Sequence, residues 1–173
     1  MFILIALAAH ETAHLISALI LRIKFYKIKI TLFGFNLNAE LESLALYKKL
    51  FLFLSGPVCN ICLYSIFTKT EYKEFADINL FLAVINMIPI VPLDGGNICK
   101  AFLEMFLNIK SVCRYMIMTN TFFIVLFLVI IHMHENYLYL LLILMGLKGI
   151  LEENRMLIEK TIRKKYNLIK FKK

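Results

Sequence analysis

The sequence predicts an all-α, multi-pass integral membrane protein, and three observations lead to this fold class. Of its 173 residues, 61% are hydrophobic, and they occur in long blocks rather than in the short alternating runs of a soluble core. Several blocks approach the ~20 helical residues needed to cross a hydrocarbon layer of ~30 Å. The polar stretches between the blocks are too short to bury a core of their own. We therefore expect no separate soluble domain.

Five apolar segments are expected to cross the membrane. They are Phe2–Leu21, Leu50–Phe67, Ile78–Leu93, Met116–His132 and Tyr137–Leu151. On this basis residues 1–151 are predicted to form one membrane-embedded domain, and residues 152–173 a basic cytoplasmic tail.

Two stretches between these segments have a different pattern. From Lys24 to Leu37 apolar and polar residues alternate, and Gly34 lies between two phenylalanines, which predicts a short β element of one or two strands with a turn after the first helix. Ile98–Asn108 has amphipathic helical spacing and is expected to lie at the membrane surface.

The basic residues predict the orientation of the chain. The net charge is +8, and alternate loops together with the C-terminal region carry eighteen lysines and arginines against two in the remaining loops. Because such residues stay on the cytoplasmic side, the N-terminus should be outside and the C-terminus cytoplasmic. The basic residues lack the interleaved aromatics of a base-stacking surface, so we expect the lipid bilayer as a partner and no nucleic acid.

Residues 10–14 form the motif HETAH in the middle of the first apolar segment. Positions four apart on a helix are separated by ~40° and ~6 Å, so His10 and His14 can bind one zinc ion from the same face. Glu11 lies ~100° from His10, where it can take a proton from water without being a ligand. Polar groups are costly there unless paired or functional. The alternative is a histidine pair satisfied by neighbouring helices.

Asp94 is the carboxylate predicted to complete the zinc site. It follows Pro89 and Pro92, which break the third apolar helix, and precedes two glycines that allow tight turns. Broken backbone at membrane depth is tolerated only inside protein or beside a wet cavity. The alternative is a carboxylate that caps the following helix at the membrane surface. Asn86 is read either as a helix-packing amide or as a donor to the oxyanion of a tetrahedral intermediate.

These motifs together resemble a known family. HETAH in the first segment, FLSGPVCN in the second, NMIPIVPLDGG in the third and the basic loop with Leu32-Phe33-Gly34 are similar to the site-2 protease group of intramembrane metalloproteases. The resemblance is to its stage IV sporulation branch, which processes a sigma-factor precursor, and it covers roughly residues 1–110.

The resemblance implies a role for each site residue. His10, His14 and Asp94 would be zinc ligands, Glu11 the general base, and Asn86 a catalytic residue that stabilises the oxyanion or positions the substrate. The substrate would be the membrane-associated pro-segment of a sporulation sigma factor, with a transmembrane anti-sigma factor as the runner-up. A membrane-protein inhibitor or regulator is expected as a further partner.

Two parts of the family pattern are not matched. Members usually carry another helix before the one with HExxH, and many carry a C-terminal nucleotide-sensing domain. This sequence starts at the HExxH helix. We therefore expect either that the natural protein starts further upstream, or that it inserts into the membrane without the additional helix.

Two other functions compete with proteolysis. One is a metal transporter that uses the same ligands as a transit site, although transporters usually spread polar groups along a path. The other is a non-catalytic membrane scaffold. For the protease, we expect the substrate to add as a β-strand along Ile28–Leu37, because a peptide bond within a helix must be extended before water can attack it.

Overall fold

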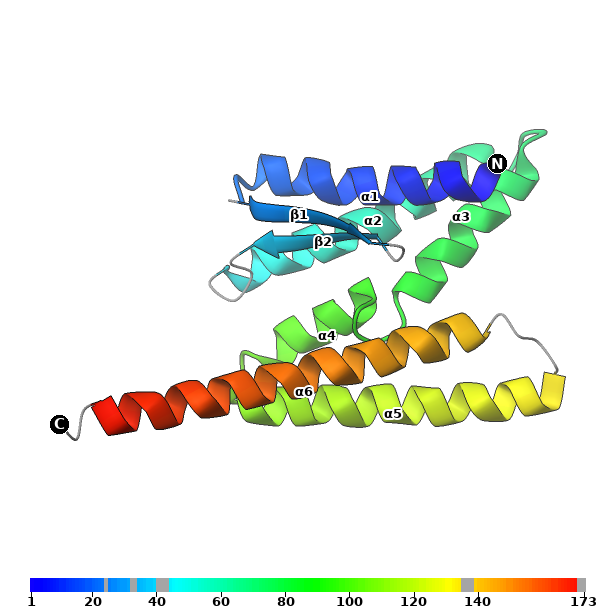
Figure 1. The fold of residues 1–173 in the computed structure, drawn as a ribbon. Helices are drawn as coiled ribbons and strands as arrows, with labels where there is room; N and C mark the ends of the chain where they lie inside the picture. Colours follow the sequence, from blue (N-terminus) through cyan, green and yellow to red (C-terminus); the bar gives the residue numbers. More distant parts are fainter. Residues whose placement is uncertain (24, 32–33, 40–43, 135–138, 171–173) are drawn as a thin grey trace. The chain divides into compact units, whose positions relative to one another are not determined.

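The computed structural model describes residues 1–173 except 24, 32–33, 40–43, 135–138 and 171–173. Within the described residues the chain forms six helices and one two-stranded sheet (Figure 1). It divides into two compact units, Met1–Ile88 and Pro89–Lys173.

The first unit is built on three mutually packed helices, α1 (Phe2–Ile20), α2 (Leu46–Phe67) and α3 (Lys73–Asn86). Small residues allow these helices to approach closely, as is usual between membrane helices: Ala6 and Ala18 of α1 and Ala76 of α3 are fully buried. Large apolar side chains of the same helices are exposed, as expected for surfaces that face lipid rather than water.

An antiparallel hairpin follows α1, formed by β1 (Phe25–Thr31) and β2 (Gly34–Ala39). Ile28 pairs with Leu37 and Ile30 with Phe35, and the register shifts between Phe25 and Lys27. The strands begin within the segment 24–37, for which one or two short strands were expected, and β2 extends two residues beyond it. Residues 32 and 33, at the expected turn, lie outside the described part of the chain.

The second unit contains α4 (Asp94–Leu103), α5 (Ile109–His134) and α6 (Tyr139–Lys170). The long helices α5 and α6 lie side by side (Figure 1), and Val91, Val112 and Met116 form a buried cluster beside α4. An ion pair joins Lys100 of α4 to Glu153 of α6, whose side chain is 1% exposed. Helix α6 runs without a break from the expected membrane domain into the expected tail.

The expectation of five membrane crossings is not supported. In the described residues three helices, α1, α2 and α5, are long and apolar enough to cross a membrane, and they support an integral membrane protein. Helix α3 has 14 residues, about 21 Å at ~1.5 Å per residue, because the proline-containing segment that follows does not continue it. Helix α6 becomes charged from Lys148 onward, so its apolar part is also short.

Candidate metal centre

Two histidines of α1 face one another inside the first unit. The exposed fractions of His10 and His14 are 3% and 9%, and their Nε2 atoms are 3.1 Å apart. The i, i+4 spacing on a helix brings the two rings together. What the pair can do depends on which ring nitrogens carry hydrogen.

The ring of His14 is oriented by backbone and hydroxyl groups of α2. Its Nδ1 lies 2.8 Å from the carbonyl oxygen of Leu52 and 3.1 Å from Ser55 Oγ. A backbone carbonyl only accepts, so Nδ1 of His14 donates its hydrogen to Leu52. Nε2 of the neutral ring then carries a lone pair.

The ring of His10 is oriented by a side-chain amide of α2. Its Nδ1 lies 2.7 Å from Oδ1 of Asn60, a fully buried residue. With the amide oxygen as the acceptor, Nδ1 of His10 is the donor. In the neutral state the two Nε2 lone pairs of His10 and His14 therefore point toward the same region.

This arrangement fits a zinc ion. Zinc binds imidazole nitrogen at ~2.0–2.1 Å in tetrahedral geometry, which places two nitrogen ligands about 3.3 Å apart. The observed separation of the Nε2 atoms is 3.1 Å. Histidine ligands of metals also usually donate their other ring hydrogen to an oxygen acceptor, as both rings do here.

Gly56 of α2 leaves space beside both rings. A Cβ atom added at this position would lie 2.6 Å from Nε2 of His10 and would overlap Nε2 of His14. Gly56 is therefore required by close approach, since any side chain would collide with both rings and displace them.

Glu11 is the neighbour of His10 on α1 and is half-buried. Successive residues on a helix differ by ~100°, so Glu11 leaves the helix in a different direction from the two histidines. Its assignment as the general base stays a prediction.

Asp94 belongs to the second unit, where it is the first residue of α4 and is half-buried. Leu93 occupies the N-cap position, so Asp94 is one residue too late to cap the helix. The assignment of Asp94 as the third ligand stays a prediction.

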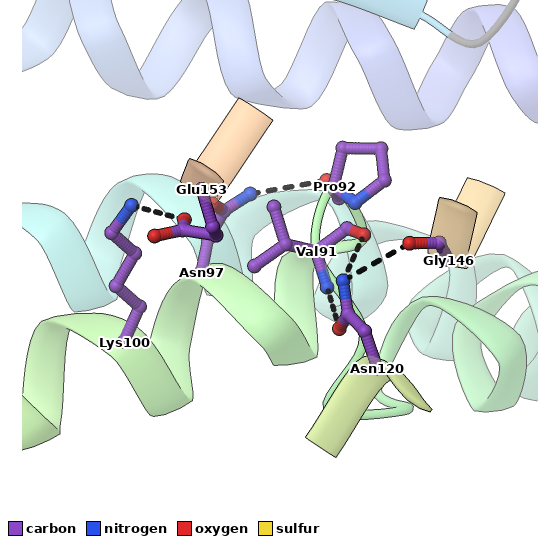
Figure 2. Close-up of polar contacts among 7 residues, drawn as sticks. All are labelled: Val91, Pro92, Asn97, Lys100, Asn120, Gly146 and Glu153. Carbon is purple, nitrogen blue, oxygen red and sulfur yellow. Dashed lines mark hydrogen bonds and ion pairs between the residues drawn. The ribbon is translucent and has the colours of Figure 1, made fainter. Parts of the chain in front are cut away.

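The segment before Asp94 is held by a buried amide of α5. The side chain of Asn120 accepts a hydrogen bond from the backbone N–H of Val91 (3.1 Å) and donates to the carbonyl oxygens of Val91 (3.2 Å) and Gly146 (3.3 Å). Figure 2 shows this contact between α5, α6 and the segment that leads into α4. Asn97 also donates to the carbonyl oxygen of Pro92 at 3.1 Å. Asn120 thus orders the backbone three residues before Asp94.

Asn86 is the last residue of α3 and is half-buried. Its Nδ2 donates to the carbonyl oxygen of Leu82 one turn earlier, at 3.0 Å. A side-chain amide has two N–H hydrogens, so this contact leaves the predicted oxyanion role chemically feasible.

Reasoning from sequence missed three polar residues around these groups: Ser55, Asn79 and Asn120. Asn79 and Asn120 are fully buried. The apolar residues around them were the available signal, because a buried amide needs a hydrogen-bond partner or a function. Asn60 was noted only as part of a motif.

Three comparisons with known proteins found similarities to this chain. The sequence model of Peptidase family M50 matches residues 70–130. A candidate zinc metalloprotease of Synechocystis sp. is 31% identical over 108 residues, which cover 56% of this chain. The chain spans only 28% of the length of that curated relative.

The fold is similar to that of the site-2 protease from Methanocaldococcus jannaschii. The TM-score is 0.59, and the match covers 90% of this chain and 76% of that chain. At 18% sequence identity this likeness shows the fold alone. The family model and the curated relative are similar to this chain in sequence over part of its length, and the solved structure is similar to it in fold.

Proposed function

We propose that this chain is an intramembrane zinc metalloprotease of the site-2 protease type. The observation that carries the proposal is the pair of buried imidazoles on α1, whose Nε2 atoms are 3.1 Å apart while both Nδ1 atoms donate to oxygen acceptors. Glu11 follows His10 directly in α1. The matches to Peptidase family M50 and to a candidate zinc metalloprotease support the same chemistry.

The zinc ligands in this proposal are His10, His14 and Asp94. Three protein ligands leave one position for water or for the substrate carbonyl, as in other catalytic zinc sites. When bound, zinc would supply Lewis acidity toward water and toward the scissile carbonyl. No other cofactor is required for peptide hydrolysis.

The remaining residues move protons and stabilise charge. Glu11 takes a proton from the attacking water and delivers it to the leaving amine. Asn86 donates an N–H to the oxygen that becomes negative as the tetrahedral intermediate forms. The burial of both imidazoles strengthens these electrostatic interactions, because less water screens them.

The substrate class follows from the resemblance of the motifs to the stage IV sporulation branch. We propose a membrane-associated sigma-factor precursor, with a transmembrane anti-sigma factor as the runner-up. A two-stranded sheet leaves an outer edge on each strand, and an extended substrate can add to such an edge. Replacing Ile30 with proline removes a backbone N–H from β1 and should reduce processing without loss of zinc.

The orientation proposed for this enzyme is N-terminus outside and C-terminus cytoplasmic, from the distribution of lysine and arginine. The basic loop after α1 then faces the cytoplasm, from which the precursor would arrive. We also propose a membrane-protein inhibitor. It binds the enzyme and keeps it inactive until cleavage is needed.

The decisive experiment is co-expression of a sigma-factor precursor with the wild type and with Glu11→Gln. We expect Glu11→Gln to lose at least about 100-fold in cleavage rate, the lower range for loss of a general base, while purified protein retains its zinc. Cleavage by Glu11→Gln at the wild-type rate would disprove the catalytic assignment. Zinc flux through vesicles that contain the wild type, without any cleavage, would favour the transporter instead.

A further inference from the structure

A chain of buried side-chain amides leads from α3 through α2 to the ring of His10. Asn79 Nδ2 donates to the carbonyl oxygen of Phe75 at 2.8 Å, and Asn60 Nδ2 donates to Asn79 Oδ1 at 3.0 Å. Asn60 Oδ1 in turn lies 2.7 Å from His10 Nδ1. Asn60 and Asn79 both have an exposed fraction of 0%.

The direction of this chain is determined at its far end. The carbonyl of Phe75 can only accept, so Asn79 must present its NH2 group to Phe75 and its oxygen to Asn60. Asn60 must then present its NH2 group to Asn79 and its oxygen to His10. His10 can satisfy that oxygen only with hydrogen on Nδ1, and this leaves Nε2 as a lone pair.

From this geometry we infer that Asn60 and Asn79 are positioning residues that hold His10 in its metal-binding tautomer. The inference deepens the proposed function and rests on it, because it assigns the outer groups of the same zinc site. Neither asparagine touches the reacting atoms. Their effect passes through the Nδ1 hydrogen of His10.

The alternative amide orientations show why both residues are needed. If Asn60 rotated by 180° it would turn its NH2 group toward His10, and the ring would then carry its hydrogen on Nε2. That tautomer cannot bind zinc through Nε2. Asn79 prevents the rotation, because its own orientation is fixed by the backbone of α3.

The energetic context favours this function over simple packing. Each buried amide is costly unless its hydrogen bonds are made. An apolar residue of similar size at positions 60 and 79 would pack the three helices without that requirement. Fixing the donor-to-acceptor direction of the hydrogen-bond chain explains why amides stand at both positions, whereas packing alone does not.

The test measures zinc affinity of the detergent-purified full chain by competition with a chelating dye, and the visible spectrum of the protein loaded with Co²⁺. We expect Asn79→Leu and Asn60→Leu each to weaken zinc binding by about 10- to 100-fold, the range for loss of a group that orients a metal ligand. Asn108→Leu is the matched control, since Asn108 is exposed and its side-chain oxygen accepts a hydrogen bond from the backbone N–H of Ser111 at the start of α5.

A rescue variant separates orientation from packing. Aspartate at position 60 offers an oxygen to His10 in either orientation, so Asn60→Asp combined with Asn79→Leu should recover most of the zinc affinity that Asn79→Leu loses. The same double variant should melt at a lower temperature than the wild type, because the hydrogen bond between positions 60 and 79 is lost and the second carboxylate oxygen of the introduced aspartate has no donor at position 79. A purely structural role predicts that affinity and melting temperature fall together.

Two results would overturn the inference. One is wild-type zinc affinity and an unchanged Co²⁺ spectrum in Asn79→Leu. The other is a double variant that binds zinc no better than Asn79→Leu alone. If the wild type itself binds no zinc, the proposed function fails, and that outcome is distinct from either result.

Discussion

Replacing Gly56 with alanine should strongly weaken zinc binding while leaving α2 intact. An added Cβ would lie 2.6 Å from Nε2 of His10 and would overlap Nε2 of His14. Alanine has the higher helix propensity, by up to ~1 kcal/mol. Helix formation alone would therefore favour the variant, and any loss must come from the crowding of the two rings.

The size of the effect follows from the distances. Ordinary contact requires at least 3.4 Å, so the His10 ring must move by about 0.8 Å, whereas metal–ligand distances tolerate about ±0.2 Å. Loss of one orienting partner of a ligand costs about 10- to 100-fold in metal affinity. Displacing the ligands themselves should cost more than about 100-fold.

The assay is the zinc content of purified protein by mass spectrometry, together with affinity by chelator competition. Val58→Ala is the matched control, because Val58 lies two residues further along α2 and is 50% exposed. It should bind zinc as the wild type does. Wild-type zinc affinity in Gly56→Ala would refute the argument that the absence of a side chain at Gly56 keeps the two rings in their metal-binding positions.

Three further predictions test other parts of the structure. Asp94→Asn should lower zinc content if Asp94 is the third ligand; wild-type zinc content in this variant would remove Asp94 from the ligand set. Asn120→Ala should weaken zinc binding by loosening the segment at Val91. This loss of affinity should vanish in an Asp94→Asn background, since the effects of coupled residues are non-additive. An equal loss in both backgrounds would contradict a role through Asp94. Lys100→Met should destabilise the protein by about 3–5 kcal/mol because it leaves the buried Glu153 carboxylate without its ion pair. Lys100→Met combined with Glu153→Leu should recover most of the lost melting temperature. Equal melting temperatures of the single and double variants would show that the ion pair is not the cause.

Much of the site could be predicted from local sequence. The HETAH spacing on a helix brings His10 and His14 together because neighbours four residues apart share a face. The proline pair that ends α3 and the glycines after Asp94 likewise act through the local backbone. For the same reason the helical membrane class and the stretch containing the hairpin could be located from the order of residues alone.

The number of crossings could not be predicted as well. The third and fifth predicted segments, Ile78–Leu93 and Tyr137–Leu151, are apolar runs. An apolar run does not determine where the helix that contains it begins and ends. Helix α3 ends at Asn86, before the prolines, and α6 continues to Lys170 through charged residues. Length and charge along the actual helices decided which of them can cross a membrane.

The sequence by itself determined the membrane class, the paired histidines of α1 and the neighbouring glutamate, because each depends on residues within one helical turn or one apolar block. Only the tertiary structure decided which tautomer those histidines adopt. The groups that orient them, Asn60 and the carbonyl of Leu52, come from another helix, 50 and 38 residues away. The clearance at Gly56 depends on the same contact between α1 and α2. Such contacts are made by side chains packing between helices, and no local periodicity encodes which residues will meet there.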